Sequence, residues 1–275
     1  SPVQLPDLPT AADGDDVRIQ LQRSDPHAGP PPGMAAAFHV TPRFATLAYA
    51  GLGTLTVRNG CELAVTPLPD ADEAQLPTAL TGAALAVLLY QRGLLVLQAS
   101  AMAIDGVAAV FLAGGGSGKS TLAAKLHQRG HTLVAEDITA IELRAGPPAV
   151  IPAAPLLRLD GATSLRLGIE ARADPSQGAA TRKGVRLVEH GFARAQAPLG
   201  VIYHLQIGGD NNIAHVPLQT GLAAVLYHSY PACLLQPGGI EHLQRCSRLV
   251  GAVPVCELIR RDDLCELPEL VQMIE

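Results

Sequence analysis

A glycine-rich segment near the middle of the chain constrains the fold more than any other feature. Residues 113–120 read Ala-Gly-Gly-Gly-Ser-Gly-Lys-Ser. The apolar run "AAVFL" precedes this segment, and "TLAAKLHQRG" follows it with leucines at helical spacing and a glycine at its end. A strand, a glycine loop and a helix in this order form a phosphate-binding loop. The sequence therefore predicts an α/β fold in which this loop joins a strand to a helix.

The residues of the loop predict how it binds a nucleotide. Glycines let backbone N–H groups turn toward phosphate oxygens, and the start of a helix favours an anion. Lys119 would place a positive charge beside the β- and γ-phosphates, and the Ser120 hydroxyl would bind Mg²⁺. The strict pattern begins with glycine, where this chain has Ala113. We expect ATP and Mg²⁺ as cofactors, held by Gly114, Gly115, Gly116, Ser117, Gly118, Lys119, Ser120 and Thr121.

An acidic pair follows the loop helix closely. The segment "HTLVAED" predicts a short strand over residues 132–135, followed by Glu136 and Asp137. In an open α/β sheet, residues at the carboxyl end of such a strand lie beside the bound ligand. One acid can hold Mg²⁺, and the other can accept or orient the proton of an attacking hydroxyl. We expect Asp137 to share the metal with Ser120 and Glu136 to be the base. The alternative is that both are surface acids.

Composition excludes several classes of protein. The formal net charge is −5, aromatic residues make up 3% of the chain and no run of Lys or Arg occurs, which argues against a nucleic-acid partner. The longest apolar stretch, residues 83–90, is shorter than the roughly 20 residues that span a bilayer. The five cysteines are scattered, as in a reducing compartment. We expect a soluble cytoplasmic protein without a membrane segment, and a homo-oligomer remains open.

The chain divides into three regions by pattern. Residues 1–37 read mostly as loop, with room for one short strand in "VRIQLQ". Residues 38–75 predict a small antiparallel β subdomain with a hairpin turn at Asn59-Gly60. Residues 76–275 would form the phosphate-loop domain, beginning with a helix that Asp70 or Asp72 could cap.

The rest of the domain gives clear elements before the glycine loop and again after residue 197. A turn at Asp105-Gly106 should join two strands before the glycine loop. Residues 145–200 stay unassigned because proline and glycine interrupt them. "PLGVIYHLQI", "NNIAHVPLQ" and "VPVCELI" predict strands, and residues 221–227, 240–249 and the final "DDLCELPELVQMI" predict helices.

The segment "GGSGKSTLAAKLHQRGHTLVAED" resembles the C-terminal domain of HPr kinase/phosphorylase, in which the loop, the helix and two acids come in the same order. "LLYQRGLLVLQASAMAIDG" and the tail "LYHSYPACLLQ" look like HPr-kinase-related proteins of bacterial gene clusters. The resemblance, over roughly residues 38–275, implies a fold related to PEP carboxykinase and a kinase acting on a serine hydroxyl. Lasso-peptide relatives imply a ribosomal peptide as acceptor. A small-metabolite kinase and a non-catalytic nucleotide-binding regulator remain alternatives.

Three departures from the family pattern bear on catalysis. Glu136 stands where the family usually has Asp, and Gln98 stands where it usually has a histidine that supports the catalytic acid. The resemblance therefore adds Gln98 to the catalytic residues and puts activation of the base in question. The Glu-x-Arg-Gly segment of true HPr kinases is absent, which argues against HPr as the substrate.

Other charged residues are weaker candidates. Arg182 or Lys183, in "TRKGVR", could reach the phosphates, although a solvated loop is the simpler interpretation. His228 could line the acceptor pocket, although a histidine with a structural role is favoured. Arg260 and Arg261 are expected at a solvated strand end.

Overall fold

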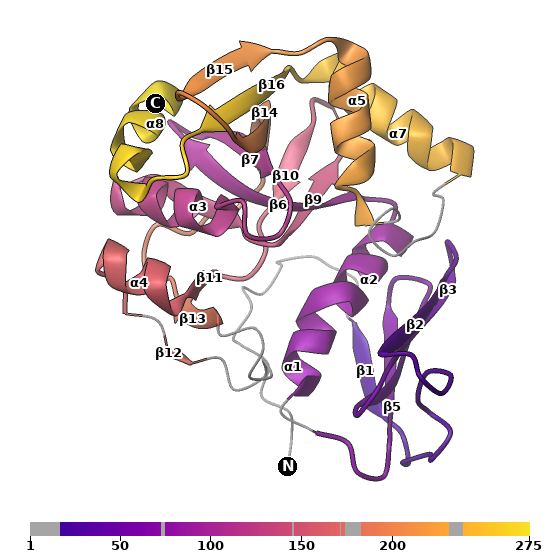
Figure 1. Ribbon diagram of the computed structural model, residues 1–275. Helices are drawn as coiled ribbons and strands as arrows, with labels where there is room; N and C mark the ends of the chain where they lie inside the picture. The colour runs from indigo at the N-terminus through magenta and orange to yellow at the C-terminus, as the bar shows by residue number, and fades with distance from the viewer. Residues whose placement is uncertain (1–16, 73–74, 145, 171, 174–182, 231–238) are drawn as a thin grey trace. The chain divides into compact units, whose positions relative to one another are not determined.

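The structure is a computed structural model that describes residues 17–72, 75–144, 146–170, 172–173, 183–230 and 239–275. The described residues fall into two compact units, which meet along the chain at Leu94 and Leu95. Figure 1 labels the elements of both units. None of the described helices combines the length and the apolar character that a membrane crossing needs.

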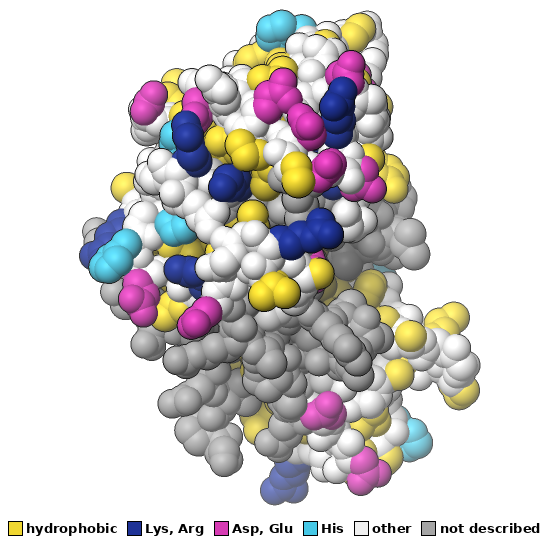
Figure 2. Space-filling view, turned by 60° about the vertical axis from the view of Figure 1, so that its left-hand side comes forward, with side chains coloured by type: hydrophobic (Ala, Val, Ile, Leu, Met, Phe, Trp, Pro, Cys, Tyr) yellow, Lys and Arg dark blue, Asp and Glu magenta, His cyan; other side chains and the backbone are white. Residues whose placement is uncertain are grey.

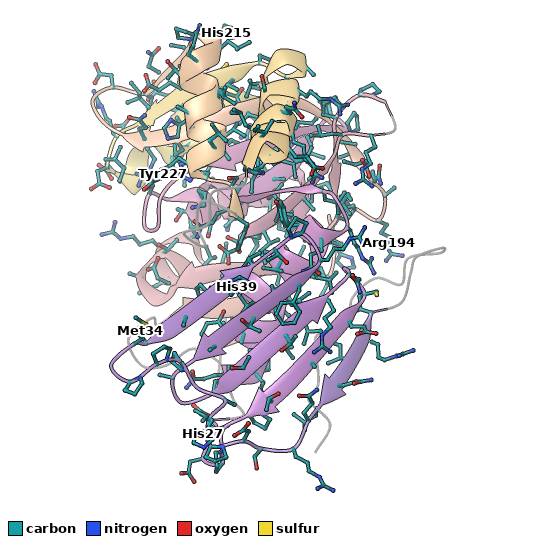
Figure 3. All side chains as sticks on the ribbon, turned by 90° about the vertical axis from the view of Figure 1, so that its right-hand side faces the viewer. His27, Met34, His39, Arg194, His215 and Tyr227 are labelled. Carbon is teal, nitrogen blue, oxygen red and sulfur yellow. The ribbon has the colours of Figure 1, made fainter. Side chains whose placement is uncertain are left out.

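The first unit contains a five-stranded sheet in the order β1-β5-β4-β3-β2. β2 to β5 form an antiparallel meander, but β1 runs parallel to β5. The expectation of a purely antiparallel sheet is therefore wrong, because the short strand expected in "VRIQLQ" forms and adds a parallel edge. Figure 3 shows the strands side by side, with His39 on β2. The strands are β1 (Arg18–Leu21), β2 (Ala36–Val40), β3 (Phe44–Tyr49), β4 (Gly53–Arg58) and β5 (Glu62–Pro67).

Two predicted tight turns are confirmed. Asn59 and Gly60, which join β4 to β5, have φ angles of 52° and 67°. Asp105 and Gly106, which join two strands of the second unit, have φ angles of 50° and 83°. Two consecutive residues with positive φ match the twist of a β-hairpin, and Asn, Asp and Gly adopt this conformation most easily.

The helical segment after this sheet belongs to the first unit. The Gly60 N–H donates to Gln91 Oε1 at 2.9 Å, and Arg92 Nε donates to the Gly60 carbonyl at 2.6 Å. These bonds tie the end of the segment to a hairpin turn, so the unit extends to Leu94 rather than to residue 75. The segment comprises α1 (Leu76–Ala79), a π-helical turn (Leu80–Ala84) and α2 (Leu85–Gln91).

The start of this segment differs from the expected cap. Gln75 precedes α1, and its side chain makes no capping hydrogen bond. Asp72 turns the chain just before the helix, because its carbonyl accepts the Gln75 N–H at 3.0 Å and its carboxylate accepts the Gln75 amide at 3.0 Å. Neither Asp70 nor Asp72 is therefore the cap. The helix begins several residues after both, with Pro77 in its first turn.

The second unit is built on an eight-stranded mixed sheet. β7, β14 and β16 are parallel, whereas β6 is antiparallel to its neighbours β7, β8 and β9. The carboxyl ends of the three parallel strands therefore meet at one edge, where ligands bind in such sheets. The strands are β6 (Leu95–Ile104), β7 (Val107–Leu112), β8 (Thr132–Ala135), β9 (Ile138–Glu142), β10 (Ala149–Ile151), β14 (Ala197–Ile207), β15 (Asn212–His215) and β16 (Val255–Arg260).

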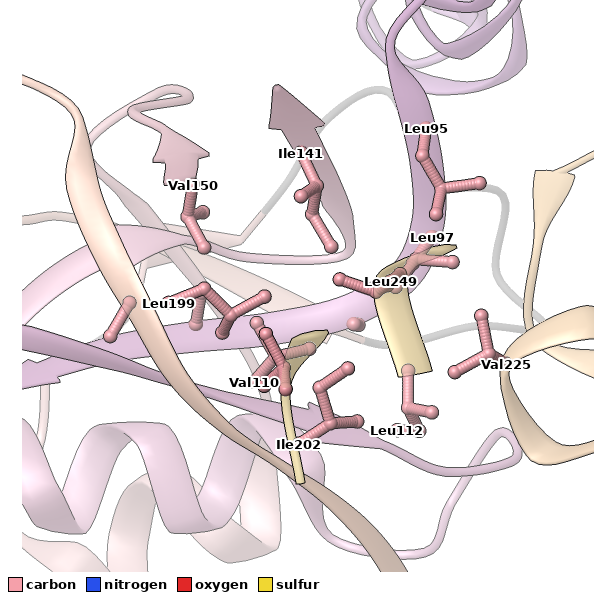
Figure 4. Packing of buried hydrophobic residues seen from close by; sticks show 14 of the residues in the cluster. Leu95, Leu97, Val110, Leu112, Ile141, Val150, Leu199, Ile202, Val225 and Leu249 are labelled. Atoms are coloured by element: carbon pink, nitrogen blue, oxygen red, sulfur yellow. The ribbon is translucent and has the colours of Figure 1, made fainter. Parts of the chain in front are cut away.

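Alternate residues of these strands enter two hydrophobic cores, one on each face of the sheet. Val110, Ile202 and Leu249 belong to the core on the side of α5 and α7 (Figure 4). Phe111 and Leu122 belong to the core on the side of α3 and α8. The helices are α3 (Lys119–Gln128), α5 (Leu218–Tyr227), α7 (Gly239–Ala252) and α8 (Leu267–Ile274), the last preceded by a 3₁₀ turn (Leu264–Glu266).

The unassigned region 145–200 contains β10 and a separate small antiparallel sheet in the order β11-β13-β12. Asp160 ends β11 and caps the next helix, since Asp160 Oδ1 accepts the Thr163 N–H at 2.9 Å. The elements are β11 (Leu156–Asp160), α4 (Gly161–Leu167), β12 (Arg172–Ala173) and β13 (Lys183–Leu187). The strands and helices predicted elsewhere in this unit form, with two larger differences at their ends. The strand expected over "NNIAHVPLQ" ends at His215 and α5 already begins at Leu218, and the final helix begins at Leu267 rather than at residue 262.

Candidate nucleotide-binding site

The glycine loop leaves the carboxyl end of β7 and enters α3. Gly116 and Gly118 have φ angles of 80° and 97°, a conformation that residues with a side chain rarely adopt. The helix begins at once, because the Leu122 N–H donates to the Gly118 carbonyl at 2.9 Å. Leu122 and Leu126 are fully buried and fix α3 against the sheet. The positive end of the α3 dipole therefore lies at the loop, where it favours an anion.

Two side chains at the start of α3 point in different directions. Lys119 is 9% exposed, and its Nζ donates to the carbonyls of Ala113 and Gly114 at 2.5 and 3.2 Å. Ser120 Oγ donates a short hydrogen bond to Glu136 Oε1, at 2.5 Å. Glu136 is 7% exposed. A buried carboxylate is thus tied directly to the loop hydroxyl.

The two neighbouring acids occupy different positions. The Ile138 N–H donates to the Glu136 carbonyl at 2.9 Å and closes a three-residue turn around Asp137. Asp137 has a φ of 70°, a γ-turn conformation that costs a non-glycine residue of order 1–3 kcal/mol. The Asp137 carboxylate lines the cavity and makes no hydrogen bond or ion pair with the part of the chain that the structure describes. Glu136 therefore contacts the loop, whereas Asp137 is available to a ligand.

β6 brings Gln98 to the same place. Gln98 pairs with Ile138 across the β6–β9 ladder, and the Ala99 N–H donates to the Asp137 carbonyl at 3.2 Å. The Gln98 backbone N–H donates to the His228 carbonyl at 2.8 Å. Gln98 lines the cavity together with both acids. The structure thus brings residue 98 and the acidic pair together.

Arg260 reaches the loop from the end of β16. It is 8% exposed, and its Nε donates to the Ser117 carbonyl at 3.0 Å while Nη1 donates to the Arg261 carbonyl at 2.8 Å. Asp262 Oδ1 lies 3.6 Å from Arg260 Nη2. The expected solvated strand end is therefore wrong for Arg260, because the strand ends beneath the glycine loop. Arg261 is exposed and pairs with Asp210.

The small sheet and α4 supply a further wall. Arg158 on β11 and Arg166 on α4 line the cavity, and within the described residues neither side chain makes a hydrogen bond or an ion pair. Asp160 also lines it, but its carboxylate accepts the Thr163 hydroxyl at 2.6 Å. This hydrogen bond lowers the pKa of Asp160. Two arginines on this wall are therefore available to an anionic ligand.

The cavity bounded by these elements has a volume of about 330 Å³. Basic and acidic residues both line the cavity. Figure 2 shows that basic and acidic side chains are also interspersed on the surface that faces the viewer there. In the described parts of the chain, no three His, Cys, Asp or Glu residues are placed to hold a metal ion by themselves. The charged side chains that line the cavity are Lys119, Glu136, Asp137, Arg158, Asp160, Arg166, Arg260 and Asp262.

None of the remaining candidates from the sequence is among the described residues that line the cavity. Arg182 falls outside the described residues, and of Lys183 the structure describes only the place in β13. His228 is 3% exposed at the end of α5, next to the exposed Tyr227 (Figure 3), and it is not among the residues that line the cavity. Burial, together with the nearby His204 and Lys119, lowers the pKa of His228 to about 4. His228 is thus a buried neutral histidine near the site.

Several residues of the cavity were not predicted from the sequence, and the strength of their sequence signal differs. Arg260 could have been found, because it ends a predicted strand and strand ends meet at the ligand edge of such sheets. Asp160 and Thr163 carried a weak signal, since Asp followed three residues later by Thr can cap a helix. Arg158 and Arg166 carried none, because nothing local shows that β11 and α4 pack beside the loop.

Comparison with known proteins adds little to this geometry. No family model and no curated protein matches the sequence. Among solved structures, the HPr(Ser) kinase/phosphatase from Coxiella burnetii is similar, with 12% sequence identity and a TM-score of 0.37 over 65% of this chain and 87% of that chain. The functional inference therefore depends on the residues of the cavity.

Proposed function

We propose that this chain is an ATP- and Mg²⁺-dependent kinase that transfers the γ-phosphoryl group to a hydroxyl. The observation that carries the proposal is the hydrogen bond from Ser120, at the start of α3, to the buried Glu136. Phosphoryl transfer needs a phosphate cradle, a lysine at the phosphates and a carboxylate near the loop hydroxyl. Their convergence on one cavity supports catalysis over a purely structural glycine turn.

The oxygen atoms at the loop fit Mg²⁺. In kinase sites this ion usually binds one or two carboxylates together with substrate phosphates, rather than a cage made only of protein. Ser120 and Glu136 offer two adjacent oxygens for it. When bound, Mg²⁺ neutralises the charge that develops on the phosphates. The sequence alone favours Asp137 as the metal ligand. The Ser120 bond favours Glu136 for that role and leaves Asp137 as the base.

In the proposed transfer, Asp137 accepts the proton of the acceptor hydroxyl and Lys119 stabilises the charge on the phosphates. The acceptor oxygen attacks the γ-phosphorus, and the bond from the γ-phosphorus to the β,γ-bridging oxygen breaks. ADP leaves with that electron pair, and the hydroxyl proton passes to the Asp137 carboxylate. Lys119 would turn from the loop carbonyls toward the β- and γ-phosphates and stabilise their charge.

For the acceptor, we propose a serine of a ribosomal peptide of the lasso-precursor kind. Only the sequence resemblance supports this choice over a small metabolite. The available Arg158 and Arg166 are compatible with negative charge on either acceptor, or on the nucleotide itself. A screen with radiolabelled ATP against peptides encoded by neighbouring genes, and against free serine and sugars, distinguishes the two acceptor classes.

The test of the kinase proposal compares the wild-type chain with Lys119→Ala. Mg-ATP should raise the stability of the wild type by about 2.7 kcal/mol at a hundredfold excess over Kd, because it binds only the folded state. The variant should lose most of this thermal shift and all detectable transfer. A wild type that shows no shift at millimolar Mg-ATP would contradict nucleotide binding.

A non-catalytic nucleotide-binding regulator is the second candidate, and Gln98 is the observation that favours it. An amide in the cavity cannot take up a proton near neutral pH, whereas the family histidine can. A regulator would show the Mg-ATP shift but no transfer to any acceptor and no ADP release. Detecting labelled product that depends on Lys119 would exclude it.

A further inference from the structure

The buried side chain of Arg260 contacts two neighbouring residues of the glycine loop, Ser117 and Gly118. Its Nε–H donates to the Ser117 carbonyl at 3.0 Å, and its side chain is almost fully buried. A Cβ placed on Gly118 would lie 3.0 Å from both Nε and Nη2 of Arg260. The guanidinium therefore packs directly against the backbone of Gly118, and a side chain at this position would force the guanidinium to shift.

The order of the strands in the sheet determines where the Arg260 side chain lies relative to the loop. β14 lies between β7, which enters the loop, and β16, which ends at Arg260. The Arg260 backbone is held as well, because it pairs with Ile207 and its carbonyl accepts the Gly208 N–H at 2.9 Å. The loop thus rests on a guanidinium anchored in the same rigid sheet.

The hydrogen bond from Arg260 holds one particular carbonyl of the loop, that of Ser117. Ser117 does not line the cavity, although the loop residues on both sides of it do. Its carbonyl is turned to Arg260, while a phosphate loop must turn its N–H groups toward the ligand. Because the peptide bond is planar, a donor that holds the Ser117 carbonyl also fixes the direction of the Gly118 N–H, and both Arg260 and Gly118 line the cavity.

We propose that Arg260 is a positioning residue that sets the glycine loop in its phosphate-binding shape through Ser117 and Gly118. For its effect on nucleotide affinity the inference rests on the proposed function. The planar fork matters more than the charge, because one N–H holds the Ser117 carbonyl and another holds the Arg261 carbonyl. The exposed Asp262 adds an ion pair of little energy.

Two substitutions and a matched control test this role. Arg260→Gln and Arg260→Lys should each weaken Mg-ADP binding roughly tenfold to a hundredfold, the worth of a hydrogen bond from a charged donor. AMP, which lacks the β-phosphate, should bind unchanged. Arg261→Gln, which removes the exposed neighbouring guanidinium, should bind Mg-ADP like the wild type. Calorimetric titration measures all four proteins.

A second measurement does not depend on nucleotide binding. Amide hydrogen exchange of residues 114–120 without ligand should quicken in Arg260→Gln and in Arg260→Lys but not in Arg261→Gln, with the rest of the sheet still protected. Unchanged exchange in both Arg260 variants overturns the inference even if the protein binds no nucleotide. Full restoration of Mg-ADP affinity by Arg260→Lys also overturns it, since charge alone would then suffice. A wild type that binds no Mg-ADP counts against the proposed function alone.

Discussion

The hydrogen bond between Ser120 and Glu136 predicts which of the two acids serves the metal. We consider the isosteric changes Glu136→Gln and Asp137→Asn, each of which removes one negative charge. Glu136 is buried against the loop hydroxyl, whereas the Asp137 carboxylate makes no hydrogen bond or ion pair with the described chain, and Asp137 lines the cavity. Glu136→Gln should therefore raise the Mg²⁺ requirement, and Asp137→Asn should lower kcat.

The magnitudes follow from these contacts. A hydrogen bond to a charged group is worth about 1.5–3 kcal/mol and a neutral one about 1 kcal/mol, so Glu136→Gln weakens the contact with Ser120 by roughly 0.5–2 kcal/mol. Losing the charge beside the ion adds to this, so the Mg²⁺ concentration for half-maximal activity should rise at least about tenfold. Removing a positioned general base should lower kcat by about 10²- to 10⁴-fold.

The assay measures kcat over a range of Mg²⁺ concentrations for both variants, with direct titration of Mn²⁺ into the ATP complex. Excess Mg²⁺ should partly rescue Glu136→Gln and should leave Asp137→Asn slow at every concentration. Nucleotide affinity should barely change in Asp137→Asn, because a base acts mainly in the transition state. The reverse pattern, with Asp137→Asn rescued by metal, would refute this reasoning and support the assignment made from the sequence.

Three further predictions concern other residues of the second unit. Lys119→Ala should lower transfer by about 10³-fold or more without unfolding the protein, and near-normal turnover would exclude this loop as the active site. Gln98→His should keep or raise activity and add an ionisation at roughly pH 6 to 7, the histidine range, whereas Gln98→Ala should lose some activity. Superimposable pH profiles of kcat/KM for the wild type and both variants would place residue 98 away from the chemistry. The pKa of His228 is about 4 in the folded state, below the value of about 6.5 in the unfolded chain. Its contribution to the free energy of unfolding is therefore complete above pH 6.5 and is lost as the pH falls toward 4. His228→Gln should therefore remove about 3 kcal/mol of this pH dependence in urea unfolding curves, and an unchanged slope would contradict the shift.

Local sequence signals were enough for the elements that carry the loop. The apolar run before the glycines, the leucine spacing of α3 and the Asn-Gly and Asp-Gly turns each determine structure through neighbouring residues alone. The parallel pairing of β1 with β5 joins strands more than forty residues apart, and no local pattern reports it. The boundary after Leu94 is similar, because bonds between Gly60 and the helix end decide it.

The candidate site shows the same division. The loop and the acids lie within 25 residues of one another, so the motif and its spacing are enough to predict that they share one site. Arg158, Arg166 and Arg260 come from segments whose approach depends on the order of the strands and on the packing of a small separate sheet. The sequence does not distinguish a buried arginine from a solvated one. Arg260 is buried because the strand that carries it ends beside the glycine loop.

The two departures from the family pattern become consistent once Glu136 is the metal ligand. A glutamate is one methylene longer than an aspartate, and here that length coincides with direct contact to the Ser120 hydroxyl. A carboxylate that faces Mg²⁺ must stay ionised, so it gains nothing from a histidine that exchanges protons beside it. A neutral amide at position 98 is then sufficient, because its strand already fixes the turn around Asp137 through the Ala99 N–H. Gln98 would in that case mark a change in which acid accepts the proton, rather than a loss of activity.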